Sequence, residues 1–408
     1  MGWNHTMKKM SLMRTLAALS ASALLLSACG GGGGGGGGPA VGPYGTSAQF
    51  AEPVAGCAVD TQKKFVRAYL DEVYLWYREI VNVDPGNYPR ADQVDDYFDA
   101  LLVKSKDRFS AAVFTGKHAT VLQSRDPAAQ ASVGELLATH SVPAAPTVTT
   151  TSGGRRVAYL RLKNEDEGSQ DELIAAFQQL QPQGVQDLVL DLRDNLGGFV
   201  YTALSAASMI TGPENDGKVF ERLVFNDKRG ESSLLFSGAV QFGDGANPQY
   251  PVGTPLPRLG LPRVFILTNP NTCSASESII NSLRGVGLQV IRIGDTTCGK
   301  PYGFTEKVNC GWSFFAIEFQ GFNAQGFGDY QGGFEPICRV ADSTTADTST
   351  RGTATDSILN AALFYADNNA CPAATATNAQ MAASPTPSPL RQPPAGARRL
   401  LLPEMLPR

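Results

Sequence analysis

The sequence predicts an α/β fold, in which the strands of a mostly parallel sheet alternate with helices. Two short runs, at residues 188–190 and 264–267, are wholly apolar, as strands buried on both faces of a sheet usually are. Each run is followed by a turn and then by apolar residues at helical spacing. This alternation implies right-handed βαβ units, whose sites gather where the carboxyl ends of strands meet helix starts.

Two amphipathic helices precede the α/β region. Apolar residues recur at helical spacing over residues 60–80, ahead of the breaker at residues 84–86, and again from about residue 91 to 105. Aromatic stripes of this kind are typical of a core, and we interpret the pair as a helical cap. Residues 111–155 carry weak folding signals, and the run 147–152 is typical of an extended linker.

Beyond residue 155 strands and helices alternate regularly. The expected strands are residues 157–162, 188–190, 219–225, 264–267 and 288–293. The expected helices cover residues 173–180, 200–210, 276–284 and 356–368. After Cys371 the chain turns to Ala, Thr, Pro and Ser, a composition that indicates a disordered tail.

The amino end has the features of an export signal. Lys8, Lys9 and Arg14 precede an apolar run, residues 16–26, that is too short to span a membrane. The run ends in Leu-Ser-Ala-Cys at residues 26–29, which resembles a bacterial lipobox. The resemblance implies cleavage before Cys29 and acylation of its thiol, so that a lipid anchor would tether the chain to a membrane. The other interpretation is an ordinary secretory peptide with a chance cysteine.

The unbroken glycine run at residues 30–38 would be a flexible spacer between this tether and the folded part. Gly30 stands where lipoproteins retained at the inner membrane carry an aspartate. The expected location is therefore the bacterial cell envelope, at the outer membrane facing the periplasm or the exterior. Met7 or Met10 would give the signal a more usual length than Met1 does.

Charge argues against nucleic acid as a partner. Residues 1–28 carry three cations and no anions, so their removal takes the formal charge from −4 to −7, whereas nucleic-acid binding needs a basic patch. With 42% hydrophobic residues, the roughly 320 residues between spacer and tail can form one large core or two domains. No cofactor or metal is expected, since the cysteines lack the close CxxC spacing of a zinc site.

Six cysteines remain besides Cys29, and an even number in an exported chain indicates disulfides. Fifteen pairings are possible, and the sequence does not choose among them. Cys273 adjoins Ser274 and Cys298 lies two residues before Lys300, so a disulfide at either cysteine would brace the site described next. The alternative is that both are buried thiols that act as small apolar residues.

Residues that carry chemistry lie at three expected turns. In residues 191–198, Gly197 and Gly198 follow a buried strand and let backbone amides approach a ligand closely. In residues 271–277, Ser274 stands at a helix start; with Glu277 it also fits a capping box, and the two roles are compatible. Residues 294–300 end in Lys300.

The three histidines offer few candidates for a Ser-His-Asp triad. His5 lies in the export signal, and His118 and His140 flank a weakly patterned stretch. A nucleophilic serine here would more naturally use a lysine as its base. That lysine must be partly desolvated, because its reference pKa of about 10.4 leaves it protonated at neutral pH.

Residues 191–198, 274–277 and 297–300 together resemble, in the same order, the motifs of the C-terminal processing, or tail-specific, serine peptidases. The resemblance covers roughly residues 157–363 and implies a crotonase-like α/β core of stacked βαβ units with an N-terminal helical cap. It implies that Ser274 is the nucleophile and Lys300 the general base, and that the amide of Ala275 and one from Gly197 or Gly198 form the oxyanion hole. The expected reaction is hydrolysis of envelope or extracellular polypeptides through an acyl-enzyme.

Two departures from the family pattern bear on activity. The family usually has a glutamine four residues after the lysine, to orient it; here that residue is Phe304, so Thr297 or Tyr302 would supply the orienting group, or activity would be reduced. The family also commonly carries a PDZ domain between cap and core, which needs about twice the length of residues 111–155. We expect that domain to be missing or a remnant, and specificity for carboxyl ends does not follow.

Three functions are compatible with the sequence. The first is a lipid-anchored serine endopeptidase. The second is a catalytically impaired lipoprotein on the same fold, whose cleft binds a peptide or an apolar ligand. The third is a cell-surface scaffold that associates through its acidic mature domain. Retention of both Ser274 and Lys300 favours the enzyme, because a binding protein needs neither.

The expected organisation has six parts. They are a lipoprotein signal peptide (1–28), a Gly-rich tether (29–52), the helical cap (53–110), a linker or PDZ remnant (111–155), the catalytic domain (156–371) and a disordered tail (372–408).

Overall fold

The computed structural model describes residues 57–114, 140–345 and 347–373. The chain divides into Met1–Ala40, which lies outside the described residues, and Val41–Arg408, to which everything below belongs. The export signal, Cys29, the glycine run and the carboxyl tail are predictions that lie outside the described residues, as do His5 and His118. Within the described ranges, no helix has the length and apolar character needed to cross a membrane.

The main sheet has six strands in the order β13-β8-β7-β4-β3-β2. They are β2 (Thr147–Thr150), β3 (Arg156–Arg161), β4 (Asp187–Asp191), β7 (Arg263–Thr268), β8 (Gln289–Gly294) and β13 (Cys338–Arg339). The edge strand β2 is antiparallel to β3, and the other pairs are parallel. Asp191 pairs with Leu267 and Thr268 with Gly294, so the carboxyl ends of β4, β7 and β8 lie side by side.

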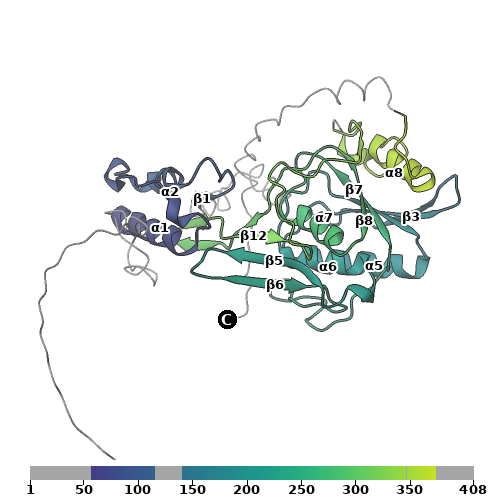
Figure 1. Ribbon diagram of the computed structural model, residues 1–408, viewed down its shortest axis with the longest axis horizontal. Coiled ribbons are helices and arrows are strands. Elements are labelled where there is room, and N and C mark those ends of the chain that lie inside the picture. Colours follow the sequence, from purple (N-terminus) through teal and green to yellow (C-terminus); the bar gives the residue numbers. More distant parts are fainter. Residues whose placement is uncertain (1–56, 115–139, 346, 374–408) are drawn as a thin grey trace, which may run out of the picture. The chain divides into compact units, whose positions relative to one another are not determined.

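Helices cover both faces of this sheet. They are α5 (Ser169–Leu180), α6 (Val200–Ile210), α7 (Ala275–Gly285) and α8 (Ser357–Asn368). Side chains alternate along each strand: Leu188 and Leu190 pack with α5, α6 and α7, whereas Val189 packs with α8. Figure 1 shows α8 and the pair α5 and α6 on opposite sides of these strands. The predicted α/β class with an N-terminal helical region is confirmed.

Two smaller antiparallel sheets complete the strands. One has the order β6-β5-β12-β9, with β5 (Val219–Phe225), β6 (Glu231–Leu235), β9 (Tyr302–Gly303) and β12 (Phe319–Phe322). The other has the order β1-β11-β10, with β1 (Ala111–Phe114), β10 (Lys307–Asn309) and β11 (Trp312–Phe315). The expected linker thus begins with strand β1 and includes strand β2, while residues 115–139 lie outside the described residues.

The cap consists of α1 (Val59–Val73) and α2 (Val94–Leu101), packed on the β1-β11-β10 sheet. Both helices are shorter than predicted. The backbone becomes extended at Tyr74, and the next amide, that of Leu75, donates to the Ile317 carbonyl, which helical geometry would prevent. Short 3₁₀ turns lie in the loops of the cap and of the α/β core, at Tyr77–Glu79, Pro85–Asn87, Ala91–Gln93, Gln181–Gln183, Pro213–Asn215 and Thr348–Thr350.

Three disulfides fix distant parts of the chain: Cys57–Cys310, Cys273–Cys298 and Cys338–Cys371. All six cysteines of the prediction are therefore paired, and the alternative of two buried thiols at 273 and 298 is wrong. The first disulfide ties the start of the cap to its sheet, and the third ties β13 to the residues after α8.

Candidate active site

Three turns meet at the carboxyl edge of the main sheet, one after each of β4, β7 and β8. The Cys273 amide donates to the Asn195 carbonyl over 3.0 Å, and the Cys298 amide donates to the Thr272 carbonyl over 3.0 Å. The Thr272 hydroxyl donates to the Leu192 carbonyl at 2.8 Å. These bonds join all three turns, so the three motifs of the sequence come together in one place.

Ser274 occupies the sharp turn from β7 into α7. Its φ of 57° and ψ of −117° lie in a region that residues with a Cβ rarely adopt. Strain of this kind is found where a nucleophilic serine is held on a strand-to-helix turn with its hydroxyl exposed. The Glu277 carboxylate accepts a hydrogen bond from the Ser274 amide at 3.1 Å, so the capping box that the sequence suggested is present at the start of α7. The Ser274 side chain also lines the cavity described below, which is compatible with a second role.

Glu277 connects the serine segment to the lysine segment. Its Oε2 atom accepts hydrogen bonds from the Ser274 amide at 3.1 Å and from the Lys300 amide at 2.7 Å. Its Oε1 atom accepts from the Gly299 amide at 2.9 Å and from the Thr297 hydroxyl. Burial raises the pKa of this fully enclosed carboxyl, and the donors oppose that rise. The sequence marks Glu277 only as a capping residue, because its bonds to Gly299 and Lys300 depend on the fold.

The disulfide Cys273–Cys298 links the same two segments a second time, with 5.2 Å between its Cα atoms. The brace that the sequence suggested is present. Cys273, Glu277 and Cys298 are also grouped closely enough to hold a metal, but the disulfide occupies both sulfur atoms and leaves one carboxylate. That donor set does not suit a metal ion.

Lys300 is buried, and aromatic rings surround its Nζ atom. The atom lies 4.1 Å from the centroid of the Phe304 ring and 5.5 Å from that of Phe109. Burial lowers the pKa of Lys300 to about 8, while the negative charges of Asp107 and Glu277 oppose the shift. At pH 7 roughly a tenth of the lysine is therefore a neutral amine that can accept a proton, and this share grows as the pH rises through the pKa.

The cap contributes to the surroundings of this lysine. Phe109 and Asp107 both lie in the loop after α2, where the buried Asp107 accepts hydrogen bonds from the Tyr74 hydroxyl and the Phe109 amide at 2.8 and 2.9 Å. In the same loop, the Arg108 guanidinium donates to the Cys298 carbonyl at 3.1 Å. Nothing in the local sequence pattern marks this loop, because its relation to Lys300 exists only in the folded chain.

Neither candidate for an orienting group forms a hydrogen bond with the Lys300 amine. The Thr297 hydroxyl donates to Glu277 and accepts from the Phe334 amide at 2.7 Å. The Tyr302 hydroxyl accepts from the Gln331 amide group at 3.2 Å. Packing against aromatic rings is what holds the Lys300 side chain among the described residues.

The glycine turn lies directly against the serine. A Cβ atom at Gly197 would come within 2.7 Å of the Ser274 Cβ and 2.9 Å of the Ala275 nitrogen, so only glycine fits. The Gly197 amide donates to the Asn195 side chain at 2.9 Å and is not available to a ligand. The neighbouring Gly198 lines the same cavity as Ala275. Of the two glycines, the geometry favours Gly198 as the partner of Ala275 in an oxyanion hole.

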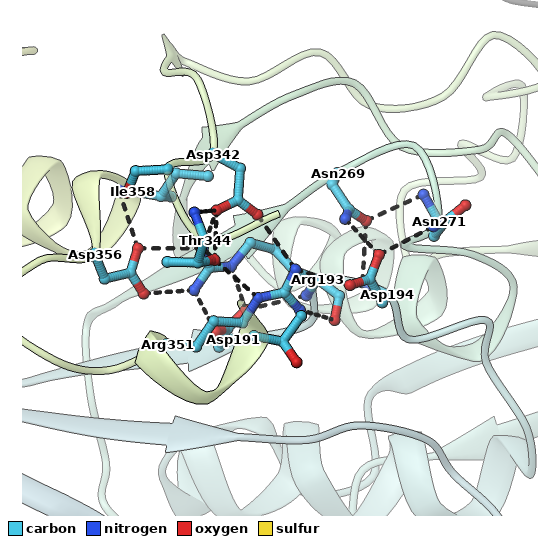
Figure 2. Close-up of polar contacts among 12 residues, drawn as sticks. Asp191, Arg193, Asp194, Asn269, Asn271, Asp342, Thr344, Arg351, Asp356 and Ile358 are labelled. Carbon is cyan, nitrogen blue, oxygen red and sulfur yellow. Dashed lines mark hydrogen bonds and ion pairs between the residues drawn. The ribbon is translucent and has the colours of Figure 1, made fainter. Parts of the chain in front are cut away.

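Figure 2 shows the polar contacts of Asp191, Arg193 and Asp194, which directly precede the glycine turn in the chain. The buried Arg193 guanidinium pairs with the carboxylates of Asp191 and Asp356, at 2.6 Å in each case. The next residue, Asp194, accepts from the side-chain amides of Asn269 and Asn271 at 2.7 and 3.0 Å. Because these asparagines precede Ser274, Asp194 locks the turn after β4 to the turn after β7.

A small cavity of about 30 Å³ opens beside the serine. Ser274, Ala275, Gly198 and Lys300 all line it, so the structure brings together the predicted catalytic and oxyanion-hole residues except Gly197, which contacts Ser274 but does not line the cavity. Its other lining residues are Val200, Glu221, Ser278, Pro301, Tyr302, Gly303, Phe304 and Phe319. Tyr302 also lines a larger groove of about 530 Å³ between the cap and the turn after β8.

His140 lies elsewhere. Its Nδ1 atom is 2.7 Å from the Glu172 carboxylate on α5, and the side chain is exposed. This histidine does not line the cavity.

Comparisons with known proteins give matches to one peptidase family. The model of peptidase family S41 matches residues 156–311, and that of the peptidase S41 N-terminal domain matches residues 61–111. The carboxyl-terminal-processing protease of Picosynechococcus sp. is 29% identical over 147 residues, which is 36% of this chain and 30% of the relative. The chloroplastic carboxyl-terminal-processing peptidase 1 of Arabidopsis thaliana is 27% identical over 149 residues, again 36% of this chain and 26% of the relative.

A crystal structure of an S41 protease from Bacteroides fragilis superimposes with a TM-score of 0.59 at 20% identity, covering 75% of this chain and 97% of that one. At this identity the likeness concerns the fold, which is the crotonase-like α/β fold of S41 proteins. The matches to the two curated relatives span less than a third of their own length. Among the described residues no PDZ domain lies between the cap and the α/β core.

Proposed function

We propose that this chain, which belongs to peptidase family S41, is a serine endopeptidase with Ser274 as nucleophile and Lys300 as general base. One observation carries the proposal: a serine on a strained strand-to-helix turn and a desolvated lysine line the same cavity. The two segments that carry them are joined by the Glu277 carboxylate and by a disulfide.

The steps follow from these groups. The neutral amine of Lys300 takes the proton of the Ser274 hydroxyl while Oγ forms a bond to the peptide carbonyl carbon. The amides of Ala275 and Gly198 stabilise the resulting oxyanion; the loss of one such donor costs about 10² to 10³ in rate. The Lys300 ammonium then protonates the leaving amine as the C–N bond breaks, which leaves an acyl-enzyme. Water, deprotonated by Lys300, hydrolyses the ester and restores the serine.

The substrates that we propose are polypeptides of the cell envelope or the exterior. The three disulfides support an oxidising compartment, and the lipobox at Cys29 supports a lipid anchor. We retain the six-part organisation given by the sequence, with a catalytic domain at residues 156–371.

Hydrolysis of an unfolded protein tests the proposal. The chain from residue 51 onwards, which keeps all the described residues, is compared with Ser274→Ala and Lys300→Ala. Cleavage by the unmodified chain and its loss in both variants, each with unchanged circular dichroism, is the expected result. Cleavage that persists in Ser274→Ala contradicts the assignment.

A further inference from the structure

A buried carboxylate that the proposed mechanism does not use lines the cavity. Glu221 lies on β5 and is only 3% exposed, yet it forms part of the wall that Ser274 and Ala275 complete. The Ser278 hydroxyl donates to its Oε1 atom at 3.0 Å, whereas its Oε2 atom has no hydrogen-bond partner among the described residues.

Stability does not account for this carboxylate. A buried polar atom without a partner costs about 1 to 3 kcal/mol. No ion pair involves Glu221 in the described part of the chain, so no cation offsets that cost. An apolar residue of similar size would pack at lower cost.

The neighbouring strand, β12, leaves room for the Glu221 carboxyl group. β12 pairs with β5, and a Cβ atom at Gly321 would come within 2.0 Å of the Glu221 Oε1 atom. Glycine at position 321 therefore lets the carboxyl occupy this place, and Ser278 on α7 fixes one of its two oxygen atoms there.

We propose that Glu221 is a specificity residue that accepts a hydrogen bond from a small hydroxyl side chain, serine or threonine, on the substrate residue whose carbonyl Ser274 attacks. The inference rests on the proposed peptidase function. The cavity adjoins the amides that would hold that carbonyl, so the side chain of the same residue enters it.

The size of the cavity selects among possible donors. Its volume of about 30 Å³ has room for about two water-sized groups. Two or three side-chain atoms fit, as in serine and threonine, whereas the five of lysine do not. Val200 and Phe319 give the wall an apolar part that suits the methyl group of threonine.

Five peptides that differ only at this residue (Ser, Ala, Thr, Val or Lys) test the proposal. The assay is run at pH 8, because burial raises the pKa of Glu221 to about 7 and the carboxylate is then mostly ionised. Because hydrogen bonds to charged groups are strong, we expect kcat/KM for the Ser peptide to exceed that for the Ala peptide by about tenfold to a hundredfold. We expect kcat/KM for the Thr peptide to exceed that for the peptide with the equally sized Val by a similar factor.

Two variants connect this preference to the carboxylate. Glu221→Leu removes both acceptor atoms, and the Ser/Ala and Thr/Val ratios are expected to fall to about one. Glu221→Gln keeps the size but weakens the acceptor, and both ratios are expected to fall part of the way. Glu231→Leu on β6, where the glutamate is exposed and pairs with Arg222, is the matched control and should keep the ratios of the unmodified chain.

The outcomes are distinct. A Ser/Ala ratio near one in the unmodified chain, or faster cleavage of the Lys peptide than of the Ser peptide, overturns the inference, whether or not the variants fold. Ratios that survive in Glu221→Leu do the same. Failure to cleave all five peptides, or cleavage that remains in Ser274→Ala, overturns the proposed peptidase and this inference with it.

Discussion

The Nζ atom of Lys300 lies 4.1 Å from the centroid of the Phe304 ring. That ring belongs to the apolar core that α1 and α2 share with the β1-β11-β10 sheet. An apolar wall cannot replace the hydration of an ammonium, which is why burial lowers the pKa of this lysine to about 8. The ring face attracts the cation and offsets part of the shift. The packing of the cap and the basicity of the lysine are thus coupled.

The first prediction concerns pH. The reaction needs the neutral form of Lys300, whose fraction grows as pH rises through its lowered pKa. We expect kcat/KM to increase with a midpoint near pH 8 and to level off about one unit above it. A pH–rate profile between about pH 6 and pH 10 measures this. A flat profile, or a maximum below pH 7, would contradict it.

Substitutions at Phe304 provide the control. Phe304→Gln places a polar amide beside the amine, partly restores its solvation and should raise the kinetic midpoint by roughly one unit. Phe304→Leu stays apolar and should not raise it. Equal midpoints in both variants would show that the ring does not set the pKa.

A second prediction concerns Glu277. Both oxygen atoms of the Glu277 carboxylate accept hydrogen bonds from backbone N–H groups, which belong to Ser274, Gly299 and Lys300. In Glu277→Gln the side-chain NH₂ group replaces one of these oxygen atoms and must therefore face at least one N–H group that it cannot accept from. An unsatisfied buried donor costs about 1 to 3 kcal/mol of unfolding free energy. Because Glu277 also positions the segments of Ser274 and Lys300, we expect kcat to fall by up to about 10²-fold. The KM should change little, because Glu277 does not line the cavity. Steady-state kinetics with circular dichroism measure both, and Glu231→Gln is the exposed control.

A third prediction separates stability from activity at the disulfides. Cys273 and Cys298 are 25 residues apart and Cys338 and Cys371 are 33 apart, so loop closure predicts a similar loss of about 3.5 kcal/mol in unfolding free energy when either pair becomes serine. Only the first pair joins the segments of Ser274 and Lys300. We expect its loss to lower kcat, whereas loss of the second pair should leave kcat unchanged. Equal kcat in the two double variants would contradict this.

A fourth prediction uses two glycines with nearly the same positive φ. Gly197 has a φ of +93° and Gly253 a φ of +89°, so alanine is similarly strained at both positions. At Gly253 the new Cβ meets open space, but at Gly197 it comes within 2.7 Å of the Ser274 Cβ. We expect both variants to lose similar backbone stability, and only Gly197→Ala to lose activity, by about 10²-fold or more. Thermal melts and hydrolysis rates distinguish them.

The sequence predicted those elements in which local pattern and final structure agree. Helix α6 and strand β5 have the bounds expected, because both are mostly apolar segments whose local pattern agrees with their place in the fold. The α1 pattern continues past Tyr74, yet the helix stops there because Leu75 pairs with Ile317, a contact 242 positions away that no local pattern shows. Strands β10 and β11 were missed, since they are short and are specified by pairing with each other.

The same distinction between local pattern and tertiary packing applies to the residues of the candidate site. The sequence predicted Ser274 and Lys300 as site residues because their motifs lie at turns after recognisable strands, and both line the cavity. Phe109, whose ring lies near the Lys300 amine, belongs to a loop of the cap. Glu221, which lines the cavity, belongs to the antiparallel strand β5 outside the main sheet. Each touches the site only through tertiary packing, so neither could be assigned from spacing along the chain.

Location of the acyl group tests the central claim most directly. The chain is mixed with an activated ester whose acyl group is slow to leave, and the modified residue is identified by mass spectrometry of its peptides. The Ser-Lys assignment predicts one acyl group on Ser274, none in Ser274→Ala, and much slower acylation in Lys300→Ala at pH 8. An acyl group on another residue, or undiminished acylation in Ser274→Ala, would contradict it.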